Sequence, residues 1–165
     1  MNERLKFGDQ TFIRDMGGKS PAYFPLDETV RIDATIVARL KQLAVDEYGG
    51  QLRLNLHGDA KSDLHEMIII ESKGAPRKIH KHAYKDESYQ IIEGAMEVRL
   101  YDDEGRLTRT ERLEAGGDMT FLFRVGKGRW HRTVPILDVV VYKESRSGPF
   151  EGGDSIEFDR ELEDV

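Results

Sequence analysis

Two histidines and a glutamate lie close together in residues 80–94, which read HKHAYKDESYQIIEG. Neighbours i and i+2 share one face of a strand but point to nearly opposite sides of a helix, so His80 and His82 can act together on a strand. Their Cα atoms would then be roughly 6.6 Å apart, which lets both imidazoles reach one ion. Glu87 follows a turn and opens the returning strand, which ends at Gly94.

Two neutral imidazoles and a carboxylate on adjacent strands have the chemistry of a metal site. The chain contains no cysteine, so thiolate ligands and iron-sulfur clusters are excluded and only nitrogen and oxygen donors are available. The alternative is a surface hairpin on which His80, His82 and Glu87 simply face water. The spacing of these residues and their flanking glycines favours the metal site.

The spacing resembles the first motif of the cupin superfamily at every fixed position, namely Gly74, His80, His82, Glu87 and Gly94. In that family the two histidines and the glutamate are metal ligands, and a second motif supplies a third histidine. The resemblance therefore implies one divalent metal ion in this chain. Zinc, iron(II), manganese and nickel all accept such ligands, and the sequence does not choose among them.

The stretch GKGRWHRTVP, residues 126–135, resembles the second cupin motif through Gly128 and His131. It departs from the common motif because Gly126 replaces a proline and Pro135 stands where an asparagine is usual. The resemblance implies that His131 completes a set of three nitrogens and one oxygen, which leaves room on the ion for water or substrate. The alternative is a packed core histidine beside the only tryptophan.

Three short stretches are similar to one branch of that superfamily, the WbuC-type cupin-fold metalloproteins associated with surface-polysaccharide gene clusters. They are RLNLH at residues 53–57, WH at 130–131 and KESRSGPF at 143–150. The resemblance covers roughly residues 50–150 and implies a cupin double-stranded β-helix, or jelly-roll barrel. It implies a small carbohydrate-like or anionic substrate but no particular reaction.

The periodicity of the apolar residues changes once along the chain. After Asp33, an N-cap candidate, apolar residues follow helical spacing as far as Gly49, which predicts one helix. From residue 51 onward, alternation and short apolar runs between turns predict strands near 51–57, 65–72, 78–82, 87–92, 95–101, 107–114, 119–125 and 138–145. The pattern predicts an all-β fold with one N-terminal helix and leaves a barrel, a sandwich and a jelly roll open.

The polar face of residues 51–57, QLRLNLH, is a candidate substrate surface. Its leucines alternate with Gln51, Arg53, Asn55 and His57, so one face of the strand is apolar and the other polar. We expect the leucines to face the helix, with Arg53, Asn55 and His57 at the mouth of the barrel beside the metal. Arg53 would clamp a carboxylate or phosphate, Asn55 would bind a hydroxyl, and His57 would act as an acid or base. The alternative turns this polar face to water.

Other polar residues near the motifs show a weaker pattern. His65 lies outside both motifs and is expected to be a surface or packing residue. Basic residues cluster in sequence around the ligands, where they can form a rim for an anionic substrate, but ordinary solvated loop charge is the favoured interpretation. These residues are Lys78, Lys81, Arg124, Lys127, Arg129 and Arg132.

A length of 165 residues suits a single domain. We expect an N-terminal arm or irregular cap over residues 1–30, a helix packed on the barrel over 31–50, the cupin barrel over 51–150, and an acidic tail over 151–165 that is disordered after Gly152-Gly153. The net charge is −6, and the tail supplies all of it, so a nucleic-acid partner is not expected. No apolar run is long enough to span a bilayer, which predicts a cytoplasmic protein with no membrane partner.

Three functions follow from these features. The favoured one is a metal-dependent isomerase, epimerase, hydrolase or oxygenase that acts on a small molecule in surface-polysaccharide biosynthesis. The alternatives are a non-catalytic, metal-dependent binding or sensor module and a structural metal in a barrel that works through protein contacts. Open coordination positions distinguish an enzyme from a structural site. A homodimer is expected because the arm carries apolar residues that a small barrel does not bury alone, namely Phe12, Ile13, Tyr23 and Phe24.

Overall fold

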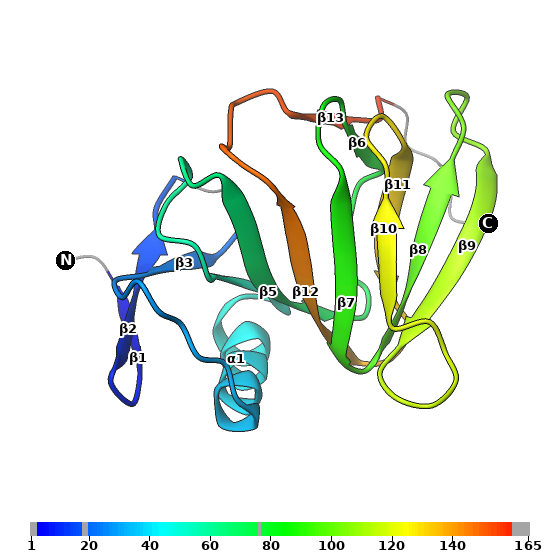
Figure 1. The fold of residues 1–165 in the computed structure, drawn as a ribbon. Helices are drawn as coiled ribbons and strands as arrows, with labels where there is room; N and C mark the ends of the chain where they lie inside the picture. The colour runs from blue at the N-terminus through cyan, green and yellow to red at the C-terminus, as the bar shows by residue number, and fades with distance from the viewer. Residues whose placement is uncertain (1–2, 18–19, 76, 160–165) are drawn as a thin grey trace.

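The computed structural model describes residues 3–17, 20–75 and 77–159, which form two β-sheets and one helix, α1 (Ala34–Glu47) (Figure 1). The larger sheet has the strand order β1 (Arg4–Phe7), β2 (Gln10–Asp15), β3 (Ala22–Pro25), β4 (Gln51–Asn55), β5 (Leu64–Ser72), β12 (Val139–Ser147), β7 (Glu87–Glu93) and β10 (Leu122–Val125). The smaller sheet has the order β13 (Ser155–Glu157), β6 (His80–His82), β11 (Trp130–Pro135), β8 (Ala95–Tyr101) and β9 (Leu107–Glu114).

Strand β5 shows how the two cores of the molecule are divided. Ile68 and Ile70 pack with α1 on the outer face of the larger sheet, and Met67 and Ile69 pack on its inner face, toward the smaller sheet. A strand that is buried on both faces reads as a continuous apolar run, which accounts for the MIII sequence of β5. The inner face is therefore the one on which a site between the sheets must be built.

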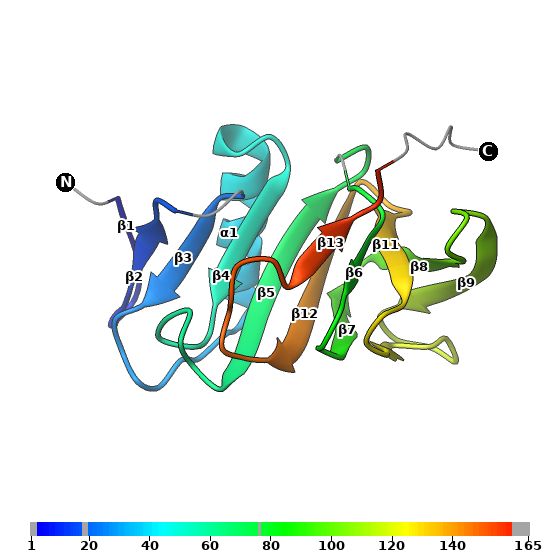
Figure 2. The ribbon, with the colours of Figure 1, turned by 90° about the horizontal axis from the view of Figure 1, so that it is seen from above.

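Helix α1 begins and ends where its local signals place it. The carboxylate of Asp33 accepts a hydrogen bond from the amide of Ile36 at 3.0 Å, so Asp33 is the N-cap. The helix ends before two glycines, Gly49 and Gly50, which both have positive φ. Its buried residues pack against β4 and β5, so the predicted helix is confirmed (Figure 2).

The N-terminal arm forms three strands in the part that the structure describes. Strands β1, β2 and β3 extend the larger sheet beyond β4, where β3 pairs with β4 in parallel. Phe12 and Tyr23 are fully buried in the core against α1. These strands are only four to six residues long and carry charged residues and a proline, so their sequence gives little strand signal.

The acidic tail also forms structure where it is described. Residues Ser155–Glu157 form β13, which pairs with the histidine-bearing strand β6. The expectation of disorder is therefore wrong for these residues, while residues 160–165 lie outside the described part of the chain. Glu157 lies opposite His80 and Ser155 opposite His82, so the tail covers an edge of the strand that matters most for the site.

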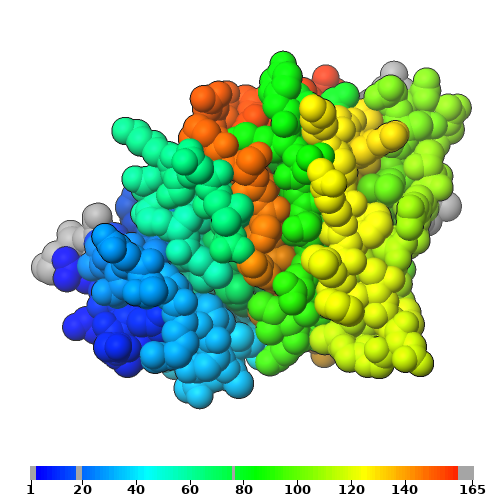
Figure 3. Space-filling model, in the orientation of Figure 1, coloured from blue at the N-terminus to red at the C-terminus, as the bar shows by residue number. Residues whose placement is uncertain are grey.

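The two facing sheets form the predicted jelly-roll barrel, with one helix, and the all-β prediction is confirmed. Strands β12, β7 and β10 lie side by side on the face seen in Figure 3. The described part of the chain contains no helix long and apolar enough to cross a membrane.

Candidate metal centre

Three strands bring the predicted ligands to one place on the inner faces of the two sheets. His80 and His82 come from β6, and His131 comes from the neighbouring strand β11, directly opposite His80. Glu87 is the first residue of β7 in the larger sheet. Ligand atoms of His80, Glu87 and His131 all lie within 4.8 Å of one another, and among the described residues this is the group that can hold a metal ion.

His82 lies at the edge of this group. Its Nε2 is 3.3 Å from Oε2 of Glu87, and its ring centroid is 5.3 Å from that of His80. Its buried Nδ1 has no hydrogen-bond partner among the described residues. Nε2 is the nitrogen that faces the carboxylate. His82 is not among the three residues whose ligand atoms lie within 4.8 Å of one another, so its role as a fourth donor stays a prediction.

Backbone carbonyls fix the orientation of two of the imidazoles. Nδ1–H of His131 donates to the carbonyl of Arg129 at 2.8 Å, and Nδ1–H of His80 donates to the carbonyl of Lys78 at 3.1 Å. In both rings Nε2 is left as the nitrogen that could take an ion, and Nε2 of His131 contacts the carboxylate of Glu87. Outer hydrogen bonds of this kind set the tautomer of a metal-binding histidine, so these two rings are arranged as ligands before any ion arrives.

Glu87 is the buried anion of the centre. Its carboxylate contacts Nε2 of His131 and accepts a hydrogen bond from the hydroxyl of Tyr89 at 2.7 Å. Burial alone would raise the pKa of Glu87, but hydrogen bonds from His131 and His82 hold the pKa well below its ordinary value. An ionised carboxylate only 3% exposed calls for a cation beside it.

The pKa values of two histidines are shifted in opposite directions. Burial, with His131 nearby, lowers the pKa of His80 to about 4, which keeps this imidazole neutral at pH 7. Burial also acts to lower the pKa of His131, but the hydrogen bond and charge of Glu87 outweigh it and raise the pKa. The imidazoles of His80 and His131 and the carboxylate of Glu87 are donors that suit a divalent ion, so the residues present fit the metal that the cupin motifs imply.

The polar face of β4 points inward, as predicted for the substrate strand. Leu52 and Leu54 pack in the core with α1. Arg53 lies opposite Ile69, and Asn55 lies opposite Met67, so both share the inner face of the sheet. The side-chain amide of Asn55 already donates to the carbonyl of Tyr23 at 3.0 Å, whereas Nε of Arg53 has no hydrogen-bond partner among the described residues. Arg53 is therefore the freer of the two to meet a ligand.

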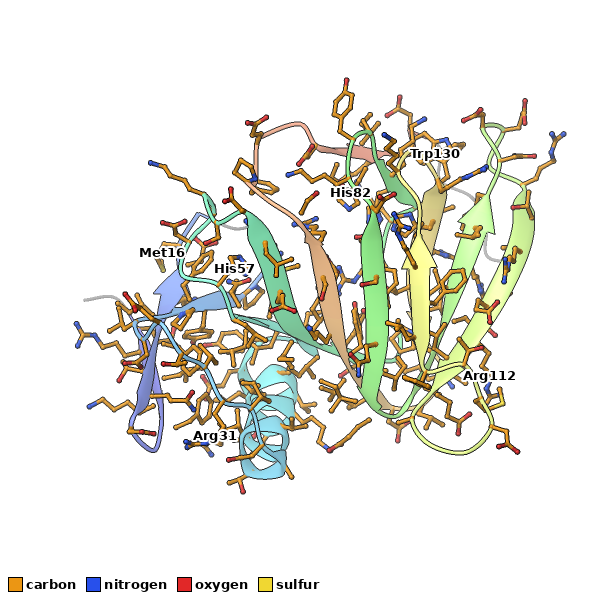
Figure 4. The ribbon with its side chains drawn as sticks, in the orientation of Figure 1. Met16, Arg31, His57, His82, Arg112 and Trp130 are labelled. Atoms are coloured by element: carbon orange, nitrogen blue, oxygen red, sulfur yellow. The ribbon has the colours of Figure 1, made fainter. Side chains whose placement is uncertain are left out.

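His57 lies farther from the metal group than the sequence interpretation expects. Its ring stacks on that of His65, with centroids 4.1 Å apart, and its Nδ1 contacts the backbone of Glu66. Figure 4 shows His82 beside β6, and His57 on the opposite side of β12. Burial lowers the pKa of His57 to about 4, so its imidazole is neutral at pH 7. His65, which is 3% exposed, is a packing residue as predicted.

Three further polar residues share the inner face and were missed from the sequence. The hydroxyl of Tyr89 donates to Glu87, and its oxygen lies 3.1 Å from Nε2 of His131. Strand β12 pairs with β7 so that Glu144 lies opposite Tyr89 and Arg146 lies opposite Glu87. The signal was available in β12, where Tyr142, Glu144 and Arg146 alternate with residues of the other face, but their partners depend on strand register.

Three of the six basic residues around the motifs have partners away from the candidate centre. Lys78 pairs with Glu157 at 2.9 Å, and Arg124 pairs with Asp86 at 2.6 Å. Lys81 lies over the ring of Trp130, in a surface groove of about 360 Å³ on the other side of β6 from the histidines. The favoured interpretation, ordinary solvated charge, agrees with these pairs.

The facing antiparallel sheets and the histidine and glutamate cluster between them define a cupin fold with a candidate metal centre. Residues 32–113 match a sequence family described as a domain of unknown function (DUF6016). A comparison with curated proteins finds no match.

Similar solved structures include three bacterial proteins. Protein SO0799 from Shewanella oneidensis is 19% identical, with a TM-score of 0.51 over 59% of this chain and 63% of that one. KdgF from Halomonas sp. is 23% identical, with a TM-score of 0.48 over 65% of this chain and 86% of that one. Oxalate decarboxylase from Bacillus subtilis is 12% identical, with a TM-score of 0.48 over 94% of this chain and 30% of that one. The match spans less than two thirds of the Shewanella protein, and similarity at these identities concerns the fold alone.

Proposed function

We propose that this protein is a metal-dependent enzyme in which His80, His82, Glu87 and His131 hold one divalent ion. The observation that carries the proposal is the placement of three imidazoles, from two adjacent strands, around one buried and ionised carboxylate. Zinc, iron(II), manganese and nickel all accept three nitrogens and one oxygen. Four protein ligands leave one or two positions on a five- or six-coordinate ion, as a catalytic site requires.

A bound divalent ion would supply Lewis acidity to an oxygen of the substrate. The residues of the chain would hold the ligands in place and exclude water. Tyr89 holds Glu87 in place through its hydroxyl, and the carbonyls of Arg129 and Lys78 hold the rings of His131 and His80. The burial of Glu87 and His131 between the sheets would exclude bulk water from the ligand atoms.

The substrate class is proposed to be a small carbohydrate-like or anionic molecule, and the process surface-polysaccharide biosynthesis. The similarity of RLNLH, WH and KESRSGPF to WbuC-type cupins supports this proposal. The inward polar face of β4 supports it independently, because Arg53 lies on the inner face of the sheet and its buried Nε has no hydrogen-bond partner among the described residues.

The test is elemental analysis of protein purified without an affinity tag or chelator. We expect close to one equivalent of a divalent metal, either as purified or after reconstitution with zinc, iron(II), manganese or nickel. The double variant His80→Ala, His131→Ala should lose the metal, and His65→Ala should keep it, because His65 is buried outside the group. Metal retained by the double variant would contradict the proposal.

Catalysis is tested separately from metal binding. The metal-loaded protein is incubated with a panel of sugar acids and sugar nucleotides, and products are followed by mass spectrometry and proton exchange. Turnover that depends on Glu87 supports an enzyme. Saturable binding with no turnover of any compound would instead support a sensor or binding module.

A further inference from the structure

The inner face of the larger sheet carries charges that the metal centre does not use. Arg53 comes from β4, and Glu144 and Arg146 come from β12. A terminal nitrogen of Arg146 lies 3.5 Å from Nε2 of His82, so its guanidinium borders the metal group directly. Glu144 lies opposite Tyr89 on the neighbouring strand, one pleat away from Arg146. The three side chains therefore line the approach from β4 to the candidate centre.

These charges are poorly matched by protein partners, in contrast to Arg77 in the loop before β6. Nε of Arg77, which is half-buried, donates to the buried Glu71 at 2.9 Å and so has a close partner of opposite charge. Nε of Arg53 is buried and has no hydrogen-bond partner among the described residues. Arg146 and Glu144 are 3.9 Å apart at their nearest charged atoms, at the outer limit of an ion pair. A buried charge without a close partner is costly, so Arg53 is poised for an external anion, and Arg146, whose ion pair with Glu144 is long, can join it.

The pKa values agree with this description. Burial lowers the pKa of Arg53, and the charges that act on it are those of Glu144, Arg146, Arg77 and Asp15 in that order. Burial, followed by the negative charge of Glu87, raises the pKa of Glu144. Glu144 is thereby a weak counterion for the two guanidinium groups.

The net charge of the groups on this face indicates the sign of the charge on a ligand that would balance it. A divalent ion and three guanidinium groups supply five positive charges. The carboxylates on this face are Glu71, Glu87, Glu144 and, farther away on β2, Asp15. Even with all four ionised, one positive charge remains, and two remain when Glu144 is protonated. A ligand with one or two negative charges would balance the site.

We infer that Arg53 and Arg146 form an anion subsite that holds the carboxylate of a small acid while a neighbouring oxygen of that acid faces the metal position. Guanidinium groups pair with carboxylates through two parallel hydrogen bonds, so the subsite would also orient the acid. This inference rests on the proposed function and narrows its substrate class to hydroxylated carboxylic acids, sugar acids included. Arg146 would hold the carboxylate on the side of the metal group, and Arg53 would hold it from the side of β4.

The experiment compares acids with neutral counterparts of similar size by calorimetry on the zinc-loaded protein. The pairs are glycolate with ethylene glycol, D-glycerate with glycerol, and D-glucuronate with D-glucose. We expect each acid to bind at least tenfold more tightly than its counterpart. Arg53→Gln should weaken glucuronate binding at least tenfold and leave the zinc content unchanged. Arg39→Gln, which removes the same charge from the exposed face of α1, should weaken it less than twofold.

Thermal unfolding gives a second measure of the same contact. Glucuronate should raise the unfolding temperature of the zinc-loaded wild type and of Arg39→Gln, but not that of Arg53→Gln. Neutral compounds that bind as tightly as the acids, or equal loss of affinity in the Arg53 and Arg39 variants, would overturn the inference. So would the absence of binding by all three acids to the wild type.

The outcome also separates this inference from the proposed function. Glucuronate binding that requires Arg53 in a protein that takes up no metal would leave the subsite standing and reject the metal enzyme. One equivalent of bound zinc with no preference for acids over neutral compounds would reject the subsite and leave the metal centre standing.

Discussion

Glu87 is the residue on which the candidate centre depends most, because each of its carboxylate oxygens faces a different imidazole. We predict that Glu87→Gln weakens zinc binding by more than the roughly 10–100-fold that loss of an outer partner costs. A neutral amide supplies one oxygen, and its NH₂ group would face an imidazole lone pair. Competition with a chromogenic chelator measures the affinity. Glu93→Gln, the same change on the same strand where Glu93 pairs with Lys41, should bind zinc like the wild type.

His57 makes stability depend on pH. Its folded-state pKa is lowered to about 4 by burial, below the value of about 6.5 for an unfolded chain. Between pH 6.5 and 4, His57 therefore binds a proton in the unfolded state but not in the folded state. The stability that is present above pH 6.5 is lost as the pH falls toward 4. This one group gives a slope of up to about 1.4 kcal/mol per pH unit in that window.

The measurement is urea unfolding of metal-free protein at several pH values between 4 and 7. His57→Gln should show a shallower loss of the free energy of unfolding as pH falls through this window, because glutamine does not titrate. Equal slopes in the two proteins would show that His57 is not protonated on unfolding. The slope is the readout, since the substitution also removes the stacking contact with His65.

At the scale of secondary structure, Gly94 connects β7 to β8 in a conformation that only glycine adopts easily. Its φ is +81°, and a Cβ there would lie 2.6 Å from the carbonyl oxygen of Val139. Gly116 has nearly the same φ, +82°, but open space around it. We predict that Gly116→Ala costs about 1–2 kcal/mol through backbone strain alone. Gly94→Ala should cost a further ~1–3 kcal/mol because the backbone of β12 must shift.

Denaturant unfolding of the two glycine variants and the wild type measures these costs. The difference between the variants isolates the contact with β12, because the strain term is common to both. Equal destabilisation would mean that β12 accommodates the methyl group without loss. A large effect at Gly94 would show that the glycine of the first motif serves the packing of the sheet.

Helices and strands with strong local sequence signals were predictable. Strands that form only by pairing with distant parts of the chain were not. Asp33 and the Gly49–Gly50 pair mark the ends of α1, and β9 matches its predicted residues 107–114. Strand β11 was not predicted from the sequence. Its buried inner residues, His131 and Thr133, are polar, so the strand shows no alternation of apolar residues. The three-residue strand β13 exists only through its pairing with β6.

The same division applies to the site. Spacing within one hairpin, and similarity to a known motif, were enough to place His80, His82 and Glu87 together. The contributions of Arg146 and Glu144 follow from the register of β12 against β7, which lies more than 50 residues away in sequence. Register is fixed by long-range packing, so a single sequence does not reveal which charged residues of β12 face the ligands.

At the scale of the whole molecule, two of the four arm residues expected to need a partner chain are already covered. Phe12 and Tyr23 are fully buried within their own chain and need no partner. A different apolar surface remains exposed around β10, an edge strand of the larger sheet. It consists of Ile92, Met119, Phe121 and Leu122, which are 37–57% exposed. Figure 3 shows that β10 and the segment before it lie on one open face of the molecule.

We predict that this surface joins two copies of the chain, because a free edge strand next to exposed apolar residues favours pairing. Light scattering at micromolar concentration should give twice the mass of one chain. Leu122→Glu places a charge on the outer face of β10, opposite Gln90, and should shift the protein to monomer without loss of metal. Leu107→Glu, an equally exposed leucine on β9, should leave the dimer intact. A wild-type protein of monomer mass would reject the dimer, and a dimer that survives Leu122→Glu but not Leu107→Glu would place its interface on the other sheet.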